Sequence, residues 1–252
     1  MQLELDGAVA LVTGGVRGVG AGISRVLADC GATVVACARR APEEVLAGAA
    51  FEPCDVRDED QVRELMTRVA DRHGRLDVLV NNAGGAPRSD AATASPRLHA
   101  KIVELNLLAP FLVAQAANAL MQEQDGGGSI VMISSVSGHR ASPGTAAYGA
   151  AKAGLDNLVA SLAVEWAPKV RVNSVVAGMV RTEQSHLHYG DEAGIAAVGA
   201  TVPLGRLAEP EEIGRCVAFL ASPLASYVSG ATLLAHGGGE APAFLAAAKP
   251  TD

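Results

Sequence analysis

The chain has 252 residues, of which 49% are hydrophobic, 19% charged and 3% aromatic. This composition excludes an intrinsically disordered chain, and with so few aromatic residues the core must be built from Ala, Val, Leu and Ile. A net charge of −7 with no basic block argues against a nucleic-acid partner.

The cysteines and apolar runs predict the cellular setting. The four cysteines form no C-x-x-C pair or short-spaced cluster, so we expect neither a metal site nor disulfides, as is usual in a reducing cytoplasm. No apolar run reaches 18 residues without a polar interruption, so no transmembrane helix is expected. Residues 1–15 lack the basic stretch of a signal peptide. We therefore expect a cytoplasmic protein without a membrane partner.

Short apolar runs that predict strands alternate along the chain with longer helical patterns. The predicted strands cover residues 8–13, 32–37, 49–54, 76–81, 129–134, 170–176 and 231–235. The run at 49–54 is the weakest of them. The predicted helices cover residues 18–30, 58–73, 97–123, 145–166 and 209–221. Strands this hydrophobic are typical of a parallel sheet that is covered on both faces.

Individual residues predict where these helices end, begin or bend. Gly31 stands where a C-cap is expected after the first helix. Asp58 can cap the second helix, and Gln61 completes a capping-box-like pair. Pro110 should kink or interrupt the helix over 97–123, because proline lacks an N–H and collides with the preceding turn.

The repeated strand–helix–strand order predicts an α/β fold with a doubly wound parallel sheet. Right-handed crossovers place the carboxyl ends of all strands at one edge, where ligands bind near the reversal in strand order. We expect about seven strands, helices on both faces and a single Rossmann-type domain over residues 1–239. Residues 240–252 form an Ala- and Pro-rich tail that is either mobile or used in assembly.

A glycine-rich loop follows the first strand and precedes the first helix. Glycines allow positive φ and a close approach to a pyrophosphate, while the helix N-terminus offers free N–H groups. The alternative is an ordinary strand–helix turn. The candidate cofactor-binding residues of this loop are Gly14, Arg17, Gly18, Val19 and Gly20.

The end of the second strand favours NADP(H) as the cofactor. An acid there would bind the ribose hydroxyls of NAD, but the strand ends in Cys37-Ala38-Arg39-Arg40. Arg39, with Arg17 from the glycine loop, suits the 2′-phosphate of NADP. The alternative is that both arginines are solvated, so NAD(H) stays possible.

Tyr148 and Lys152 lie on one face of a predicted helix, at a spacing of i, i+4. Together with the glycine loop, this pair makes the sequence similar to the classical short-chain dehydrogenase/reductase family over residues 5–239. Further matching motifs are Asp55-Val56, Asn81-Asn82-Ala83-Gly84, Asn106, Ser135, Gly178-x-x-x-Thr182, Ser229-Gly230 and Gly237-Gly238. Each motif alone is weak, but their order and spacing are specific.

The resemblance implies roles for these residues. The catalytic set would be Asn106, Ser135, Tyr148 and Lys152, of which the last two would also contact the cofactor. The other implied cofactor-binding residues are Asp55, Val56, Asn82, Ala83, Gly84, Gly178, Val180 and Thr182. One departure from the family is Ala177-Gly178, where Pro-Gly is usual.

The residue types fit the transfer of a hydride and a proton between a cofactor and a ketone or secondary alcohol. A free phenol has a pKa of about 10, and one ammonium about 4 Å away supplies the roughly 4 kcal/mol that lowers it by about 3 units. Lys152 can act in this way on Tyr148. Ser135, chosen over Ser134 by the family's spacing, would bind the substrate oxygen, or it caps the strand end. Asn106 would hold a water beside Lys152, or it marks a helix distortion before Pro110.

Two features bear on the substrate and the assembly. Residues 183–200 occupy the place of the family's variable lid, and their three glycines suit a mobile segment. His186 and His188 lie there, but without a third ligand we expect no metal. The helix over 145–166 is apolar or small nearly all round, so we expect burial on every side and, as the resemblance implies, a homotetramer.

Other classes of function remain as alternatives. The first is a catalytically inactive dinucleotide-binding sensor or scaffold, against which the intact Ser135, Tyr148 and Lys152 argue. The second is a nucleotide-sugar or methyl-transfer enzyme on a similar sheet, since the fold alone does not fix the function. The sequence does not specify which carbonyl or alcohol is the substrate.

Overall fold

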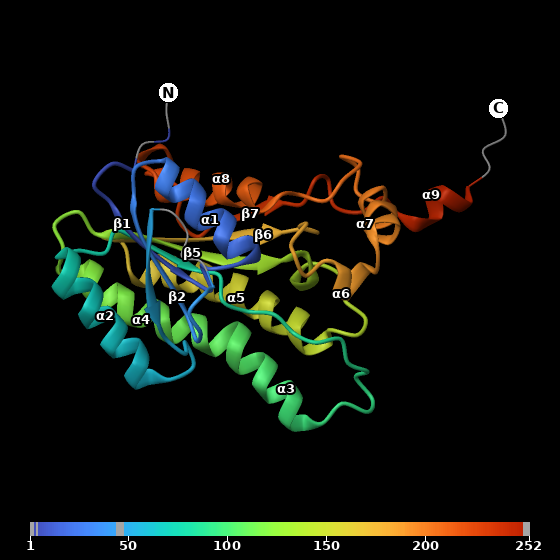
Figure 1. The fold of residues 1–252 in the computed structure, drawn as a ribbon, viewed down its shortest axis with the longest axis horizontal. Coiled ribbons are helices and arrows are strands. Elements are labelled where there is room, and N and C mark those ends of the chain that lie inside the picture. Colours follow the sequence, from blue (N-terminus) through green and yellow to red (C-terminus); the bar gives the residue numbers. More distant parts are fainter. Residues whose placement is uncertain (1–2, 4, 44–47, 249–252) are drawn as a thin grey trace.

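The computed structural model describes residue 3, residues 5–43 and residues 48–248. Among these residues, seven parallel strands form one sheet in the order β3-β2-β1-β4-β5-β6-β7 (Figure 1). The strands are β1 (Val9–Thr13), β2 (Thr33–Ala38), β3 (Ala49–Pro53), β4 (Val78–Asn81), β5 (Gly128–Ser135), β6 (Val170–Ala177) and β7 (Thr232–Ala235). The strand order reverses between β1 and β4, so the predicted doubly wound sheet and its central switch point are confirmed.

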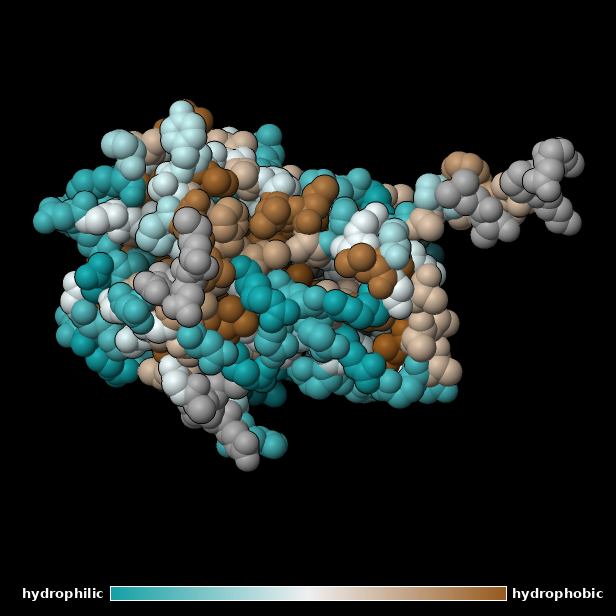
Figure 2. All heavy atoms as spheres, turned by 90° about the horizontal axis from the view of Figure 1, so that it is seen from above, coloured by the Kyte–Doolittle hydropathy of each residue, from teal (hydrophilic) through white to brown (hydrophobic). Residues whose placement is uncertain are grey.

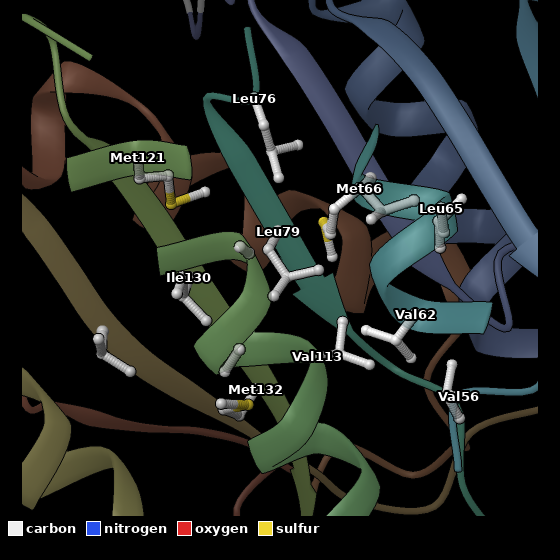
Figure 3. Packing of buried hydrophobic residues seen from close by; sticks show 14 of the residues in the cluster. Val56, Val62, Leu65, Met66, Leu76, Leu79, Val113, Met121, Ile130 and Met132 are labelled. Carbon is white, nitrogen blue, oxygen red and sulfur yellow. The ribbon is translucent and has the colours of Figure 1, made fainter. Parts of the chain in front are cut away.

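Helices cover both faces of this sheet (Figure 1). The main ones are α1 (Gly18–Asp29), α2 (Glu59–His73), α3 (Pro96–Val103), α4 (Ala109–Glu123), α5 (Ala146–Glu165) and α8 (Pro210–Ala221). One buried cluster joins α2, α4 and α5 to the sheet, and a second joins α1 and α8 to the opposite face. Figure 3 shows the first cluster, in which Met66 of α2 and Val113 of α4 point toward Leu79 of β4.

Alternation along the strands explains why the apolar runs are continuous. Leu79 belongs to the cluster under α2 and α4, whereas Val78 and Val80 belong to the cluster under α1 and α8. Both faces of the sheet are covered at β4, so all four of its side chains are buried. Strand β4 begins at Val78, two residues later than the sequence pattern predicts.

The predicted helix ends are only partly correct. Gly31 has a φ of +92°, as expected after the end of α1. The Asp58 side chain accepts from the Gln61 N–H at 3.1 Å, which confirms the N-cap of α2. The capping box is wrong, because the Gln61 amide oxygen accepts from the Asp55 N–H, at 2.9 Å, instead of closing onto the Asp58 backbone.

Pro110 lies in a helix that continues through it from Pro96 to Glu123, with a π-helical turn over Glu104–Leu108 just before the proline. The interruption is thus a local widening rather than a break. By length and composition this helix could cross a membrane, although no transmembrane helix is expected from the sequence. Its stripe through Val113, Ala117 and Met121 is fully buried against the sheet.

Within the single chain, helix α5 is buried along one face and exposed along the other, so its burial on every side in an assembly stays a prediction. One stripe, which includes Ala151, Leu155 and Val159, packs on the sheet. The opposite face is exposed in the chain, and Val164 there is 80% exposed. The small residues on this exposed face are Ala150, Ala153 and Ala160. The sequence could not separate the faces, because residues of similar hydropathy occupy both of them.

The predicted lid and tail form short helices at one end of the molecule. Residues 183–200 contain α6 (His186–Tyr189) and α7 (Glu192–Gly199). The tail contains α9 (Ala243–Ala247), which stands away from the body in both views (Figures 1 and 2). Phe244 of α9 is 69% exposed. Residues 249–252 of the predicted tail lie outside the described residues.

Candidate active site

The loop between β1 and α1 has a conformation that requires glycine at several positions. Gly14 and Gly18 have φ values of +63° and +52°, which favour glycine. A Cβ on Gly20 would lie 2.1 Å from the Gly14 carbonyl oxygen, so only glycine fits where the helix turns back on the loop. The N-cap residue Arg17 makes no side-chain bond to the first turn of α1 within the described chain. The amides of that turn are therefore suited to an anionic ligand.

Thr13 and Asn82 hold this loop against the end of β4. The Thr13 hydroxyl accepts from the backbone N–H groups of Asn82 and Ala83, each at 3.0 Å. The Asn82 amide donates to the carbonyl oxygens of Thr13 at 3.0 Å and Gly14 at 3.2 Å. These bonds join the carboxyl ends of β1 and β4, which is the switch point of the sheet.

A cavity of about 480 Å³ opens along this edge of the sheet. It brings together every residue predicted to bind the cofactor. These are Gly14, Arg17, Gly18, Val19, Gly20, Arg39, Asp55, Val56, Asn82, Ala83, Gly84, Tyr148, Lys152, Gly178, Val180 and Thr182. Ser135 also lines the cavity. The lining residues run from the end of β2 to the end of β6, past the switch point of the sheet, where α/β proteins of this topology bind ligands.

Three guanidinium groups line the cavity near the end of β2: Arg17, Arg39 and Arg57. Arg57, which the sequence analysis missed, binds both oxygens of the Asp55 carboxylate, at 2.9 Å and 2.5 Å. This contact is the main reason that the pKa of Asp55 is lowered, and Arg39 adds to the lowering. The Asp55 charge is thus offset by the guanidinium of Arg57.

Tyr148 and Lys152 face the cavity from one side of α5. The Lys152 ammonium lies 5.7 Å from the centre of the Tyr148 ring and donates to the Ile133 carbonyl oxygen at 2.7 Å. Burial lowers the pKa of Lys152 to about 8, and the nearby Asp156 carboxylate partly opposes this.

The pKa of the Tyr148 phenol is raised, first by burial, while the Ser135 hydroxyl beside it has a smaller lowering effect. The sequence pattern predicted that the lysine would lower this pKa. In the structure the ammonium is bound to the Ile133 carbonyl instead.

Ser134 and Ser135, at the end of β5, both line the cavity but make different hydrogen bonds. Ser134 is buried, and its hydroxyl donates to the Asp156 carboxylate at 2.7 Å. Ser135 lines the cavity and also accepts from the Ser137 N–H at 3.2 Å. Because both serines line the cavity, the choice of Ser135 stays a prediction, and the strand-end capping contact at Ser135 is present.

Asn106 lies behind the cavity wall, in the π-helical turn, and is completely buried. Its amide exchanges two hydrogen bonds with the backbone of Gly85, at 2.8 Å and 2.9 Å, and donates to the Ile102 carbonyl at 2.9 Å. The side chain therefore fixes the loop after β4. A Cβ on Gly84 would lie 2.7 Å from the Asn106 amide oxygen and 3.6 Å from the Lys152 ammonium. Gly84 therefore lies between the side chains of Asn106 and Lys152.

Gly178 forms the cavity wall after β6, where the family's usual proline is absent. A Cβ on Gly178 would lie 2.8 Å from the Cα of His236, so the two backbones are in close contact. Thr182 follows in the same segment and accepts from the Gln184 N–H at 3.3 Å. Packing against His236 supplies part of the rigidity that the missing proline would give.

The segment predicted as a lid contributes three residues to the cavity that were not among the predicted site residues: Glu183, Gln184 and His188. No spacing rule connects them to the glycine loop, because the contact depends on how α6 folds back. Among the described residues, no group of three or more His, Cys, Asp or Glu side chains could hold a metal ion.

Comparison with known proteins shows the family of this chain. A family model described as Enoyl-(Acyl carrier protein) reductase matches residues 14–240. A tropinone reductase homolog of Arabidopsis thaliana is 35% identical, over 98% of this chain and 97% of its own length. A 3alpha-hydroxysteroid dehydrogenase of Mediterraneibacter gnavus is 35% identical, over 94% of this chain and 98% of its own. The chain belongs to the short-chain dehydrogenase/reductase family.

Solved structures support the same assignment. The aldohexose dehydrogenase of Thermoplasma acidophilum superposes with a TM-score of 0.87 at 29% identity, covering 99% of this chain and 97% of that one. The protein is thus an oxidoreductase of a family that uses NAD(P) and acts on small molecules. The predicted family and fold are confirmed.

Proposed function

We propose that this short-chain dehydrogenase/reductase is an NADP(H)-dependent oxidoreductase that interconverts a ketone and a secondary alcohol. The observation that carries this proposal is that Ser135, Tyr148 and Lys152 line the same cavity as the glycine loop. A cis-4-hydroxycyclohexanecarboxylate dehydrogenase of Sinomonas cyclohexanicum, 39% identical over 91% of this chain and 95% of its own length, supports a secondary alcohol as substrate.

The side chains have distinct tasks in this proposal. The bound cofactor supplies or accepts the hydride. Tyr148 gives the proton to the carbonyl oxygen in reduction and takes it back in oxidation, while Ser135 donates a hydrogen bond to the same oxygen. Lys152, when protonated, stabilises the phenolate that Tyr148 becomes. Asn106 positions Lys152 indirectly, through the loop at Gly84 and Gly85.

The cavity residues also have distinct tasks toward the cofactor. The first turn of α1, with Gly14, Gly18, Val19 and Gly20, would hold the pyrophosphate. Asp55 and Val56 would lie against the adenine, while Asn82, Ala83, Gly84, Gly178, Val180 and Thr182 would line the way to the nicotinamide. The cavity is lined by Arg17, Arg39 and Arg57, and its Asp55 carboxylate is already paired with Arg57, which favours NADP(H).

The assembly and setting belong to the same proposal. The exposed face of α5 carries small and apolar residues over 150–164, which suits contact with a second copy of the chain. We propose a homotetramer that works in the cytoplasm, with residues 183–200 as a lid over the substrate. The inactive sensor remains the alternative function.

A panel of ketones and secondary alcohols, followed at the absorbance of reduced nicotinamide, tests the proposal. We expect turnover of at least one pair with NADPH or NADP⁺, in preference to NADH or NAD⁺. Cofactor binding without turnover of any pair would favour the sensor.

A further inference from the structure

A second cavity, of about 200 Å³, adjoins the cofactor cavity at Gly178, which lines both. Val136, the next residue after Ser135, forms part of its wall. A substrate whose carbonyl reached Ser135 and Tyr148 would therefore extend into this cavity. A role of the second cavity in substrate choice rests on the proposed function, because the substrate is that of the same site.

Most of the walls of this second cavity are apolar or made of backbone and imidazole rings. Met179 and Val136 supply side chains, and His139 and His236 supply rings. His139 is already paired, with its Nε2 3.0 Å from the Asp156 carboxylate. The charged side chains that line the cavity, among the described residues, are Arg140 and Glu240.

Arg140 and Glu240 form an ion pair at the rim, although they are 100 positions apart in the chain. The other end of the Arg140 guanidinium donates to the Ala141 carbonyl at 2.9 Å. The two side chains keep 41% and 36% of their surface exposed, so a soluble ligand can reach them. Tyr189 of α6 lies near this pair: burial raises the pKa of its phenol, Arg140 lowers that pKa and Glu240 raises it.

The backbone before Glu240 is built to place it there. Three successive glycines, Gly237, Gly238 and Gly239, have φ values of +64°, +94° and +84°, which other residues rarely adopt. Gly237 is held by the Leu204 N–H, and Gly239 donates to the His236 carbonyl at 3.0 Å. The chain turns sharply after β7 and brings the Glu240 carboxylate onto Arg140.

We propose that Glu240 is a specificity-determining residue, which neutralises Arg140 and so restricts the second cavity to uncharged substrates with a compact apolar body. An arginine at the rim would otherwise bind a substrate carboxylate in bidentate form. Glu240 occupies that guanidinium and adds a negative charge of its own, so a substrate anion meets both competition and repulsion.

Two substrates that differ by one charge test this inference: cyclohexanone and 4-oxocyclohexanecarboxylate, each reduced with NADPH. We expect the wild-type protein to have the higher kcat/KM for cyclohexanone. In Glu240→Gln, the ratio should shift toward the carboxylate by about fivefold, the factor expected for a half-exposed ion pair. The matched control is Arg140→Gln with Glu240→Gln, which should lose this gain because the cation is gone.

A binding measurement covers the case in which neither ketone is turned over. Cyclohexanecarboxylate, titrated by calorimetry into the protein saturated with NADPH, should bind Glu240→Gln about fivefold more tightly than wild type. Equal affinities, or an equal substrate ratio in wild type and Glu240→Gln, would overturn the inference while leaving the oxidoreductase assignment intact. Failure of the whole ketone panel, with the predicted calorimetric difference present, would instead count against the proposed function.

Discussion

Asp156 lies one helical turn beyond Lys152 on α5, and its carboxylate raises the pKa of the ammonium that burial otherwise lowers. The Asp156 carboxylate accepts from the Ser134 hydroxyl at 2.7 Å and meets the His139 ring at 3.0 Å. Its second oxygen is buried without a hydrogen-bond partner in the described part of the chain. Asp156, which does not line the cofactor cavity, therefore affects the pKa of Lys152, the proposed catalytic lysine.

Asp156→Asn should therefore move the alkaline decline of activity to lower pH. Lys152 has a pKa of about 8, below its usual 10.5, so its charge is present below pH 8 and is lost above it. Removing the carboxylate lowers this pKa further, and a shift of about half a unit gives a rate at pH 9 about threefold lower relative to pH 7. Glu165→Gln on the same helix is the control. Superimposable pH profiles for Asp156→Asn and wild type would contradict this role.

Arg39→Asp should shift cofactor preference from NADPH toward NADH. The new carboxylate repels a 2′-phosphate and can accept from a ribose hydroxyl. Because Arg17 and Arg57 remain, we expect NADPH affinity to fall by about tenfold, as for the loss of one charge-assisted contact. Dissociation constants for both cofactors, measured by fluorescence titration, check this. A wild-type protein that binds NADH more tightly than NADPH would rule out the proposed preference.

The lid segment over 183–200 should gain protection from hydrogen exchange when cofactor and substrate bind. Glu183, Gln184 and His188 line the cavity, so a ligand there contacts the segment directly. Exchange measured by mass spectrometry on the free and ternary forms gives the comparison. The buried strand β5 serves as the internal control, and unchanged protection of 183–200 would argue against closure.

Ala160→Glu should weaken the proposed tetramer without unfolding the chain. Ala160 is exposed on α5, so a charge there costs the monomer little but would be buried in a helix–helix interface. Ala151→Glu on the same helix is unsuitable for this test, because Ala151 is buried in its own domain. Light scattering with size exclusion should show four times the chain mass for wild type and less for Ala160→Glu. Thr67→Glu on α2 is the control, and a wild-type monomer at micromolar concentration would refute the assembly.

The parts of the fold that depend on local pattern were predictable. Continuous apolar runs located the strands, and the glycine loop with Tyr148 and Lys152 identified the family. Contacts between distant segments were not predictable in the same way. The bonds of Asn106 to Gly85 and the pairing of Arg140 with Glu240 depend on the folded chain.

Some local features were also missed, for a different reason. Arg57 is only two residues from Asp55, yet the sequence does not show that the pair closes over a cavity. Ala151 and Ala160 have the same side chain on one helix but opposite exposure, so composition could not assign their faces. Sequence spacing shows which side chains lie close enough to interact, but the folded structure determines which of them are buried and in contact.

Turnover by Tyr148→Phe tests the central claim most directly. The variant keeps the ring in its half-buried place but removes the only phenolic proton that this position can offer to a carbonyl. On a ketone that the wild-type protein reduces with NADPH, we predict a loss of about 10²- to 10⁴-fold in kcat, with NADPH affinity nearly unchanged. A Tyr148→Phe variant that turns over within a few-fold of wild type would contradict the assignment of Tyr148 as the proton donor.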